Sequence, residues 1–288
     1  MTWPRALPAL VTAFRTDGSL DVDANRKNIE TVGTRGARGV LLAGSTGQGP
    51  YLESGERAQL VRAARDANTD MFVISGVHAE TTQAAIAACG ESADAGADAV
   101  LVVTPTTLVR GRVAAVEQFY LDVADSCSVP VLLYSVPGVT GWALPTDTAV
   151  RLAEHPNVVG IKDSGGDPDR VDAMRPAIAA GFIVYAGASR ALAPSAMHGA
   201  WGAITASANY ALTEVGLAAR GDAAAQSRLT QLTSIVESYG VPGTSFASLV
   251  CGLHPGAMRR PLLPVDEDAR NAIGHALATA GLGITKER

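Results

Sequence analysis

The chain has 288 residues, of which 47% are hydrophobic, and a formal net charge of -5 at pH 7. This length allows one large domain with an extensive core, and the acidic balance disfavours nucleic acid binding, which needs clustered Lys and Arg. The sequence has no run of eighteen apolar residues and no signal-peptide pattern at its start, so we expect a cytoplasmic protein that does not enter a membrane.

Eight short apolar segments recur along the chain, with helical periodicity between them. Each is rich in Val, Ile and Leu and too short for a buried helix, which is typical of strands buried on both faces. The segments are 6–11, 39–44, 71–76, 99–103, 131–134, 158–162, 182–187 and 202–205. Strands that alternate with helices predict a parallel α/β sheet, and eight such units predict a (β/α)₈ TIM barrel.

An open, doubly wound sheet is the alternative fold. It is disfavoured because no G-x-G-x-x-G motif follows the first predicted strand. We therefore expect a barrel over residues 1–208. Helical periodicity without any strand-like run then predicts the last barrel helix and a C-terminal helical extension over residues 209–288.

The cysteines and histidines indicate neither a disulfide framework nor a metal site. Cys89, Cys127 and Cys251 form no C-x-x-C pair, which indicates free thiols. The five histidines show no metal-ligand spacing, so we expect no metal and no other cofactor. His78 follows the third predicted strand closely, but a role in the core or at the surface is favoured over catalysis.

Lys162 ends the apolar segment VVGIK and precedes the polar loop DSGGD. In a (β/α)₈ barrel this end of the strand faces the active site. The pKa of a lysine is normally near 10.4, but desolvation would lower it and leave a free amine that can form an imine with a carbonyl. Considered alone, Lys162 is more simply explained as a side chain that extends from a strand end to water.

Two further features follow neighbouring predicted strands. Tyr134 ends the segment VLLY, and its phenol can transfer a proton, although a buried structural tyrosine is an equally good explanation. The loop GSTGQG (44–49) offers backbone N–H groups and the hydroxyls of Ser45 and Thr46. Such a nest suits a carboxylate, and an ordinary strand–helix turn is the alternative.

Taken together, these residues resemble the dihydrodipicolinate synthase and N-acetylneuraminate lyase superfamily of Schiff-base pyruvate aldolases. The likeness covers nearly the whole chain. It rests on GSTGQG (44–49), VTP (103–105), YSVPGVTG (134–141), GIKDSGGD (160–167), AGAS (186–189) and GAITASANY (202–210).

The resemblance implies that Lys162 forms a Schiff base with pyruvate or another 2-oxo acid and that Tyr134 transfers protons. Ser45 and Thr46 would bind the 2-oxo acid carboxylate, and Thr46 would also join the proton relay. Gly187 and the main chain of Ile204 would line the pyruvate pocket. The resemblance further implies a homotetramer built as a dimer of dimers.

The sequence departs from the family pattern at three places. Dihydrodipicolinate synthases usually carry an arginine where this chain has Val139, and that arginine binds a carboxylate of the second substrate. The tyrosines that usually follow VTP are replaced by Thr106-Thr107-Leu108, and the usual Glu of the first loop is Gln48. The side chains expected to face the aldehyde partner are Val139, Gly138, Thr107, Ser164 and Ser207.

The residues of these motifs are most similar to those of 4-hydroxy-2-oxoglutarate aldolases and 2-keto-3-deoxygluconate aldolases. The main hypothesis is therefore cleavage of a 4-hydroxy-2-oxo acid to pyruvate and an aldehyde, or the reverse condensation. The alternatives are a 4-hydroxy-tetrahydrodipicolinate synthase-like reaction, dehydration of a 2-oxo sugar acid, and binding of a 2-oxo acid with impaired turnover.

Overall fold

The computed structural model describes residues 2–283, and their eight parallel strands form one sheet in the order β1-β8-β7-β6-β5-β4-β3-β2. A backbone bridge between Ala9 and Leu41 joins its two outer strands and closes it into a barrel. This confirms the predicted (β/α)₈ TIM barrel and excludes the open sheet. The strands are β1 Ala6–Pro8, β2 Gly39–Leu42, β3 Phe72–Val77, β4 Ala99–Val103, β5 Val131–Ser135, β6 Val158–Asp163, β7 Ile183–Ala186 and β8 Gly202–Thr205.

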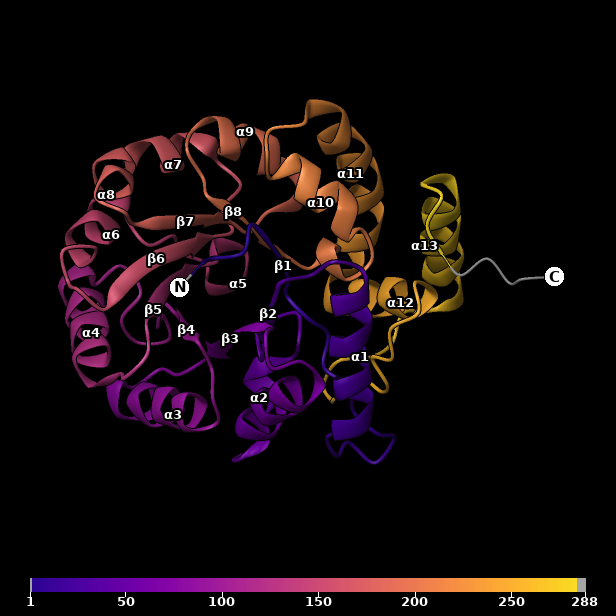
Figure 1. Cartoon of the computed structure of the whole chain (residues 1–288), viewed down its shortest axis with the longest axis horizontal. Helices are drawn as coiled ribbons and strands as arrows, with labels where there is room; N and C mark the ends of the chain where they lie inside the picture. The colour runs from indigo at the N-terminus through magenta and orange to yellow at the C-terminus, as the bar shows by residue number, and fades with distance from the viewer. Residues whose placement is uncertain (1, 284–288) are drawn as a thin grey trace.

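The helices surround the strands as a ring (Figure 1). Several of them have an N-cap residue whose side chain accepts a hydrogen bond from a backbone N–H of the first turn, as Asp21 does for α1 and Thr81 for α3. The helices of the ring are α1 Val22–Thr34, α2 Glu56–Ala67, α3 Thr82–Asp94, α4 Val113–Ser126, α6 Thr146–Leu152, α7 Pro168–Ala173, α8 Arg175–Ala179, α9 Leu192–Met197, α10 Leu212–Ala218 and α11 Ala223–Val236. A short helix, α5 Pro137–Thr140, lies in the loop after β5.

The hydrophobic core has an inner and an outer part, because successive side chains of a strand point to opposite faces. The inner part fills the barrel and includes Leu41, Ile74, Leu132 and Ile204. The outer part lies between the strands and the helices. Both faces of each strand are therefore buried, which explains the continuous apolar segments in the sequence.

The first strand is shorter than predicted. It ends at Pro8, whereas the apolar segment continues to Val11. Leu10 and Val11 are buried against the outer core, and the backbone N–H of Val11 donates to the side chain of Asn209 rather than to a strand. After Pro8 the backbone makes only a single bridge to β2 and then leaves the sheet, while its side chains stay buried, which explains why the sequence pattern extended the element too far.

After α11 the chain continues into α12 Gly240–Val250 and α13 Glu267–Thr279, which pack against α11 and against each other. Figure 1 shows them attached outside the ring, beyond α10 and α11. The predicted extension runs to residue 288, and its last part, 284–288, lies outside the described residues.

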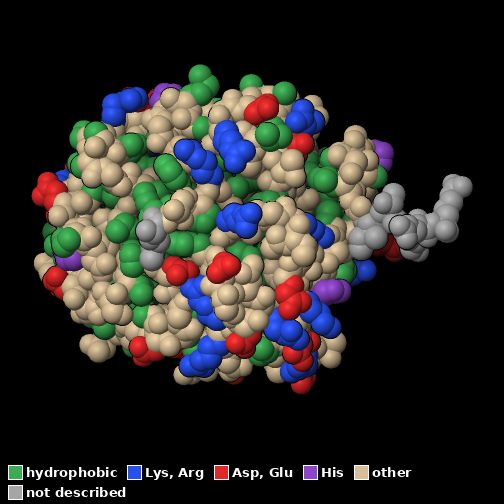
Figure 2. All heavy atoms as spheres, in the orientation of Figure 1, with side chains coloured by type: hydrophobic (Ala, Val, Ile, Leu, Met, Phe, Trp, Pro, Cys, Tyr) green, Lys and Arg blue, Asp and Glu red, His purple; other side chains and the backbone are tan. Residues whose placement is uncertain are grey.

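The surface mixes charges of both signs. Figure 2 shows acidic and basic side chains intermingled over the region of α1, where Arg26 pairs with Asp23 and Glu30. No helix within residues 2–283 is both long and apolar enough to span a bilayer. The three cysteines are free thiols, as predicted.

Candidate active site

Lys162 and Tyr134 meet inside the barrel. They are register partners on the adjacent strands β6 and β5, so both side chains point inward at the same level. Lys162 Nζ donates a hydrogen bond to the Tyr134 hydroxyl at 3.3 Å and lies 4.4 Å from the centre of its ring. Each residue is only 4% exposed. Within residues 2–283 no carboxylate lies within ion-pair distance of Lys162.

The surroundings of Tyr134 favour ionisation of its phenol. Burial alone would raise the pKa of Tyr134, but the positive charge of Lys162 opposes this, together with the polar side chains of Ser45, Lys162 and Ser164 beside the phenol. The net effect is a pKa below its usual value. A phenol of this kind can give and take a proton more readily than a free tyrosine.

Gly187 leaves the space that Lys162 and Ser164 occupy. A Cβ atom at Gly187 would overlap Ser164 Oγ and would lie 2.9 Å from Lys162 Cε. The backbone N–H of Gly187 donates to Asp163 O at 2.7 Å, which fixes the loop after β7 against the end of β6. The sequence-predicted residues Lys162, Tyr134, Ser164 and Gly187 therefore come together in one site.

The loop after β2 brings Ser45 to the same place. Ser45 is close enough to Tyr134 to lower the pKa of the phenol, and its buried Oγ has no hydrogen-bond partner among residues 2–283. The loop is tightly wound, because Ala43 and Gln48 both adopt positive φ angles of 53° and 56°. A Cβ atom at Gly49 would overlap the carbonyl oxygen of Ala43, so the loop requires glycine there. Thr46, next to Ser45, is partly exposed.

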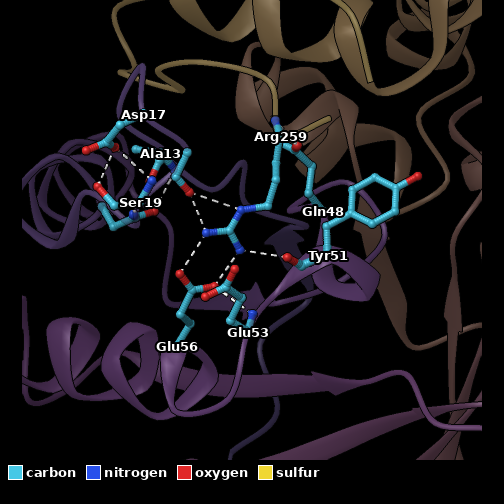
Figure 3. Close-up of polar contacts among 10 residues, drawn as sticks. Ala13, Asp17, Ser19, Gln48, Tyr51, Glu53, Glu56 and Arg259 are labelled. Atoms are coloured by element: carbon cyan, nitrogen blue, oxygen red, sulfur yellow. Dashed lines mark hydrogen bonds and ion pairs between the residues drawn. The ribbon is translucent and has the colours of Figure 1, made fainter. Parts of the chain in front are cut away.

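A cluster around Arg259 supports this loop from outside (Figure 3). The backbone N–H of Arg259 donates to Gln48 Oε1 at 2.9 Å, and its guanidinium pairs with both carboxylate oxygens of Glu56. The same guanidinium donates to the carbonyl oxygens of Tyr51 and Gly18. The cluster thus ties the loop between α12 and α13 to the segment that holds Ser45.

A second ion pair holds the loop after β6. Asp163 is 6% exposed, and its Oδ2 accepts from Arg170 Nε at 2.9 Å. Its Oδ1 accepts from the backbone N–H of Gly165 at 2.8 Å. The sequence analysis did not identify this pair, although the seven-residue spacing across the loop KDSGGDPDR offered a weak signal.

The loops after β7 and β8 are joined by a chain of hydroxyls. Ser207 is fully buried, lies 2.8 Å from the Ser189 hydroxyl and donates to Thr205 Oγ1. The hydroxyl of Ser207 is therefore engaged by other hydroxyl groups inside the protein, and the expectation that it faces the aldehyde partner stays a prediction. Ser189 donates to Glu237 at 2.5 Å, and burial raises the pKa of that carboxyl.

The remaining predicted positions lie at the rim or in the barrel wall. Val139 on α5 is 70% exposed, and Thr107 is exposed on the loop after β4. The backbone N–H groups of Thr106 and Thr107 both donate to Glu80, which holds this loop in place. Ile204 packs in the inner core together with Tyr134.

Within residues 2–283 no group of three or more His, Cys, Asp or Glu side chains is arranged to hold a metal ion. The side chains that meet at the Lys162 site supply an amine, a phenol and hydroxyl groups. A buried amine beside a phenol is the arrangement that imine formation and proton transfer require.

Comparison with known proteins shows the family of the chain. Residues 3–280 match the model of the Dihydrodipicolinate synthetase family. The chain belongs to this family. It is 33% identical over 293 residues to 4-hydroxy-tetrahydrodipicolinate synthase 1 of Streptomyces coelicolor, with 96% of this chain and 95% of that protein covered. It is 34% identical over 286 residues to the 4-hydroxy-tetrahydrodipicolinate synthase of Thiobacillus denitrificans, with 94% and 96% covered.

A solved structure is similar over its whole length. The crystal structure of the chloride-inhibited dihydrodipicolinate synthase from Acinetobacter baumannii, complexed with pyruvate, has a TM-score of 0.89 and 31% identity. The similarity covers 98% of this chain and 100% of that chain.

Membership of the dihydrodipicolinate synthetase family confirms the expected superfamily, and the protein is an enzyme of the lyase class. The names of the relatives agree with the synthase-like alternative better than with the main hypothesis of a 4-hydroxy-2-oxo acid aldolase. The finer resemblance to the two aldolase groups is not confirmed.

Proposed function

We propose that this enzyme forms a Schiff base between Lys162 and a 2-oxo acid such as pyruvate, and that it makes or breaks the C3–C4 bond of a 4-hydroxy-2-oxo acid. The contact between Lys162 Nζ and the Tyr134 hydroxyl carries the proposal. It is supported by the match to the family and by the pyruvate complex of the Acinetobacter baumannii relative.

In the direction of cleavage, the amine of Lys162 attacks C2 of the substrate and water leaves, which gives an iminium ion. The phenolate of Tyr134 takes the proton of the C4 hydroxyl, and the C4 oxygen becomes the carbonyl of the departing aldehyde. The electrons of the C3–C4 bond move into the iminium and form an enamine. A proton added at C3 and hydrolysis of the imine then release pyruvate and the free lysine. Condensation follows the same steps in reverse.

Reduction with borohydride in the presence of pyruvate tests the shared first step. The expected result is a reduced pyruvyl adduct on the peptide that contains Lys162, and no adduct in the variant Lys162→Ala. An adduct on another lysine, or none in the wild-type enzyme, would overturn the proposal.

Two reactions share this intermediate, and each has a specific observation in its favour. The synthase reaction is favoured by relatives with that name at 33% and 34% identity. Cleavage of a 4-hydroxy-2-oxo acid is favoured by Val139, an apolar and 70% exposed side chain where the synthases usually carry an arginine. Product analysis distinguishes the two reactions. Formation of 4-hydroxy-tetrahydrodipicolinate supports the first, and release of pyruvate plus an aldehyde supports the second.

The variant Val139→Arg sharpens this comparison. Because the position is open to solvent, an arginine fits without displacing a neighbour, and we expect it to improve kcat/KM for an aldehyde that carries a carboxylate. Adduct formation with pyruvate alone should not change. Val139→Gln, which adds length without charge, is the matched control.

We also propose the homotetramer that the family resemblance implies. Leu108, at the tip of the loop after β4, is 89% exposed, which is unfavourable for a large apolar side chain unless another subunit covers it. Sedimentation analysis of the wild-type enzyme and of Leu108→Ser tests this. A monomeric wild-type enzyme would contradict the proposal.

A further inference from the structure

The end of β4 is fastened to the end of β5 at Tyr134. The register between the two strands ends with the pair Val103–Tyr134, and the backbone N–H of Thr104 then donates to Tyr134 O at 3.1 Å. The next residue, Pro105, has no backbone N–H and cannot add another rung. On the side of β4, the backbone of Tyr134 therefore lies at the end of the strand ladder, where paired elements open most easily.

Two buried hydroxyl groups strengthen this end of the ladder. Thr104 Oγ1 donates to the same Tyr134 carbonyl at 3.0 Å and lies 2.9 Å from the hydroxyl of Tyr120. The Tyr120 hydroxyl is also 3.0 Å from Val102 O, so its single proton serves either Thr104 or that carbonyl. Tyr120 and Thr104 are 0% and 1% exposed, so bulk water does not compete for these contacts. A hydroxyl from a helix thus reaches the two strands at the level of Tyr134.

Packing alone does not explain the Tyr120 hydroxyl. Tyr120 lies on α4, and the other buried side chains of this helix, Val116, Phe119, Val123 and Ala124, are apolar. They recur at helical spacing and pack in the outer core. Phenylalanine would fill the same space as Tyr120, whereas a buried hydroxyl costs free energy unless it is hydrogen-bonded. The role of the hydroxyl must therefore come from its contacts with β4 and β5.

The two buried tyrosines differ in charge behaviour. Burial raises the pKa of Tyr120, whereas the net pKa of Tyr134 lies below its usual value. Tyr120 therefore stays protonated and can only hold hydrogen bonds, while Tyr134 is the phenol that can give and take a proton.

The contact between Tyr134 and Lys162 is sensitive to small movements. Its length of 3.3 Å is already at the long end for a hydrogen bond, and an outward shift of roughly 0.5 Å would break it. On the side of β6, strand pairing continues past Tyr134 to the pair Ser135–Asp163. On the side of β4, the hydroxyls of Thr104 and Tyr120 take the place of such a further pair.

We propose that Tyr120 is a positioning residue for Tyr134. Together with Thr104, its hydroxyl holds the end of β5 where the phenol of Tyr134 meets the amine of Lys162. Tyr120 does not touch the substrate and acts through the backbone of Tyr134. The inference rests on the proposed imine chemistry and adds to it a residue of the outer core.

Deuterium exchange into the methyl group of pyruvate tests the inference without an aldehyde partner. Once pyruvate forms an imine with Lys162, a base must remove a proton from C3, and in heavy water a deuteron replaces it. The phenol of Tyr134 is the base beside Lys162. The exchange rate, followed by NMR, therefore reports the position of this phenol.

Three variants change the hydroxyl pair, and a fourth is the matched control. Tyr120→Phe keeps the ring without the hydroxyl, Thr104→Val keeps the shape without the hydroxyl, and Thr104→Ser keeps the hydroxyl. Ser92→Ala is the control, because Ser92 of α3 and Ser75 of β3 form a buried hydroxyl pair at 2.8 Å in the preceding strand–helix unit.

For Tyr120→Phe and Thr104→Val we expect exchange about 10-fold slower, part of the roughly 10²-fold that a misplacement of about 1 Å can cost. Thr104→Ser and Ser92→Ala should exchange close to the wild-type rate. The pH of half-maximal exchange should rise in Tyr120→Phe, because burial still raises the pKa of Tyr134 while the lowering charge of Lys162 is farther away. In a Tyr134→Phe background, Tyr120→Phe should slow the residual exchange by less than about 2-fold.

Exchange at the wild-type rate in Tyr120→Phe would overturn the inference. An equal loss in Ser92→Ala, or a loss in the Tyr134→Phe background as large as in the wild type, would also overturn it, because the effect would then not act through Tyr134. In each case, a reduced pyruvyl adduct on Lys162 of the wild-type enzyme would leave the proposed function standing. The absence of that adduct would refute the function itself.

Discussion

The variant Gly187→Ala tests whether the space around Lys162 is as tight as the structure indicates. Gly187 does not have a positive φ angle, so alanine is compatible with its backbone and only the added methyl group matters. That methyl would overlap Ser164 Oγ and lie 2.9 Å from Lys162 Cε, whereas carbon atoms in contact prefer about 3.5–4.0 Å. Lys162 Cε must therefore move by roughly 0.6–1 Å, or the loop must shift.

Two consequences follow from this overlap. Overpacking a buried site costs about 1–3 kcal/mol, which should appear as a lower free energy of unfolding in urea. Misplacing a reacting group by about 1 Å can reduce the rate about 10²-fold. We therefore expect borohydride trapping of pyruvate by Gly187→Ala to be about 10²-fold slower than in the wild-type enzyme. Gly138→Ala is the control, because a methyl group there has no neighbour within 4 Å.

A second substitution separates the two overlaps. Ser164→Ala removes the Oγ atom that the new methyl would meet but leaves Lys162 Cε in its way. The double variant Gly187→Ala/Ser164→Ala should therefore regain stability more completely than it regains the trapping rate. If Gly187→Ala traps pyruvate at the wild-type rate, the pocket inferred around Lys162 is wrong.

Three further predictions concern the support of the site and its proton transfer. Arg259→Gln should lower the free energy of unfolding in urea by about 3–5 kcal/mol, because it leaves Glu56 buried without its partner; the side chains of this pair are only 12% and 10% exposed. Arg228→Gln, at an arginine that is 55% exposed, should lower it far less, because an ion pair in solvent contributes little to stability. Burial raises the pKa of Glu56, but the hydrogen bonds from Arg259 and from the backbone of Glu53, together with the charge of Arg259, outweigh it, so the net pKa lies below its ordinary value. The stability that Glu56 contributes is therefore present above the pKa of the unfolded state and is lost as the pH falls through the pKa of the folded state. The difference in free energy of unfolding between wild type and Glu56→Gln should therefore shrink in acid. A difference that stays constant with pH would contradict this. Tyr134→Phe should reduce turnover by about 10²–10⁴-fold while pyruvate is still trapped on Lys162, and equal losses in both assays would refute a role in proton transfer.

The barrel and its central pair could be predicted because both follow from local patterns. Strands buried on two faces produce apolar segments that are visible without a structure. The last residue of one such segment is Tyr134, and the last residue of the next is Lys162. Since neighbouring parallel strands end at the same side of a barrel, the two were expected within reach of each other, and the register pairs them directly.

The groups that the sequence analysis missed are those whose partners are distant in the chain. Arg259 and Glu56 are separated by 203 positions, and no spacing rule links them. His78 was assigned to the core or the surface because a single histidine has no ligand pattern. Its place level with Tyr134 follows only from the register of β3, β4 and β5.

The site therefore has a buried half and an exposed half, which differ in physical origin. Lys162, Tyr134 and Gly187 lie on or directly after strands, where close packing leaves little room for substitution. Val139 and Leu108 lie on loops at the rim, where 70% and 89% of their surface is open to solvent and a new side chain displaces nothing. A change of aldehyde partner can thus arise at the rim without disturbing imine formation below it. Variants at the rim, rather than variants of Lys162 itself, are therefore expected to distinguish the two proposed reactions.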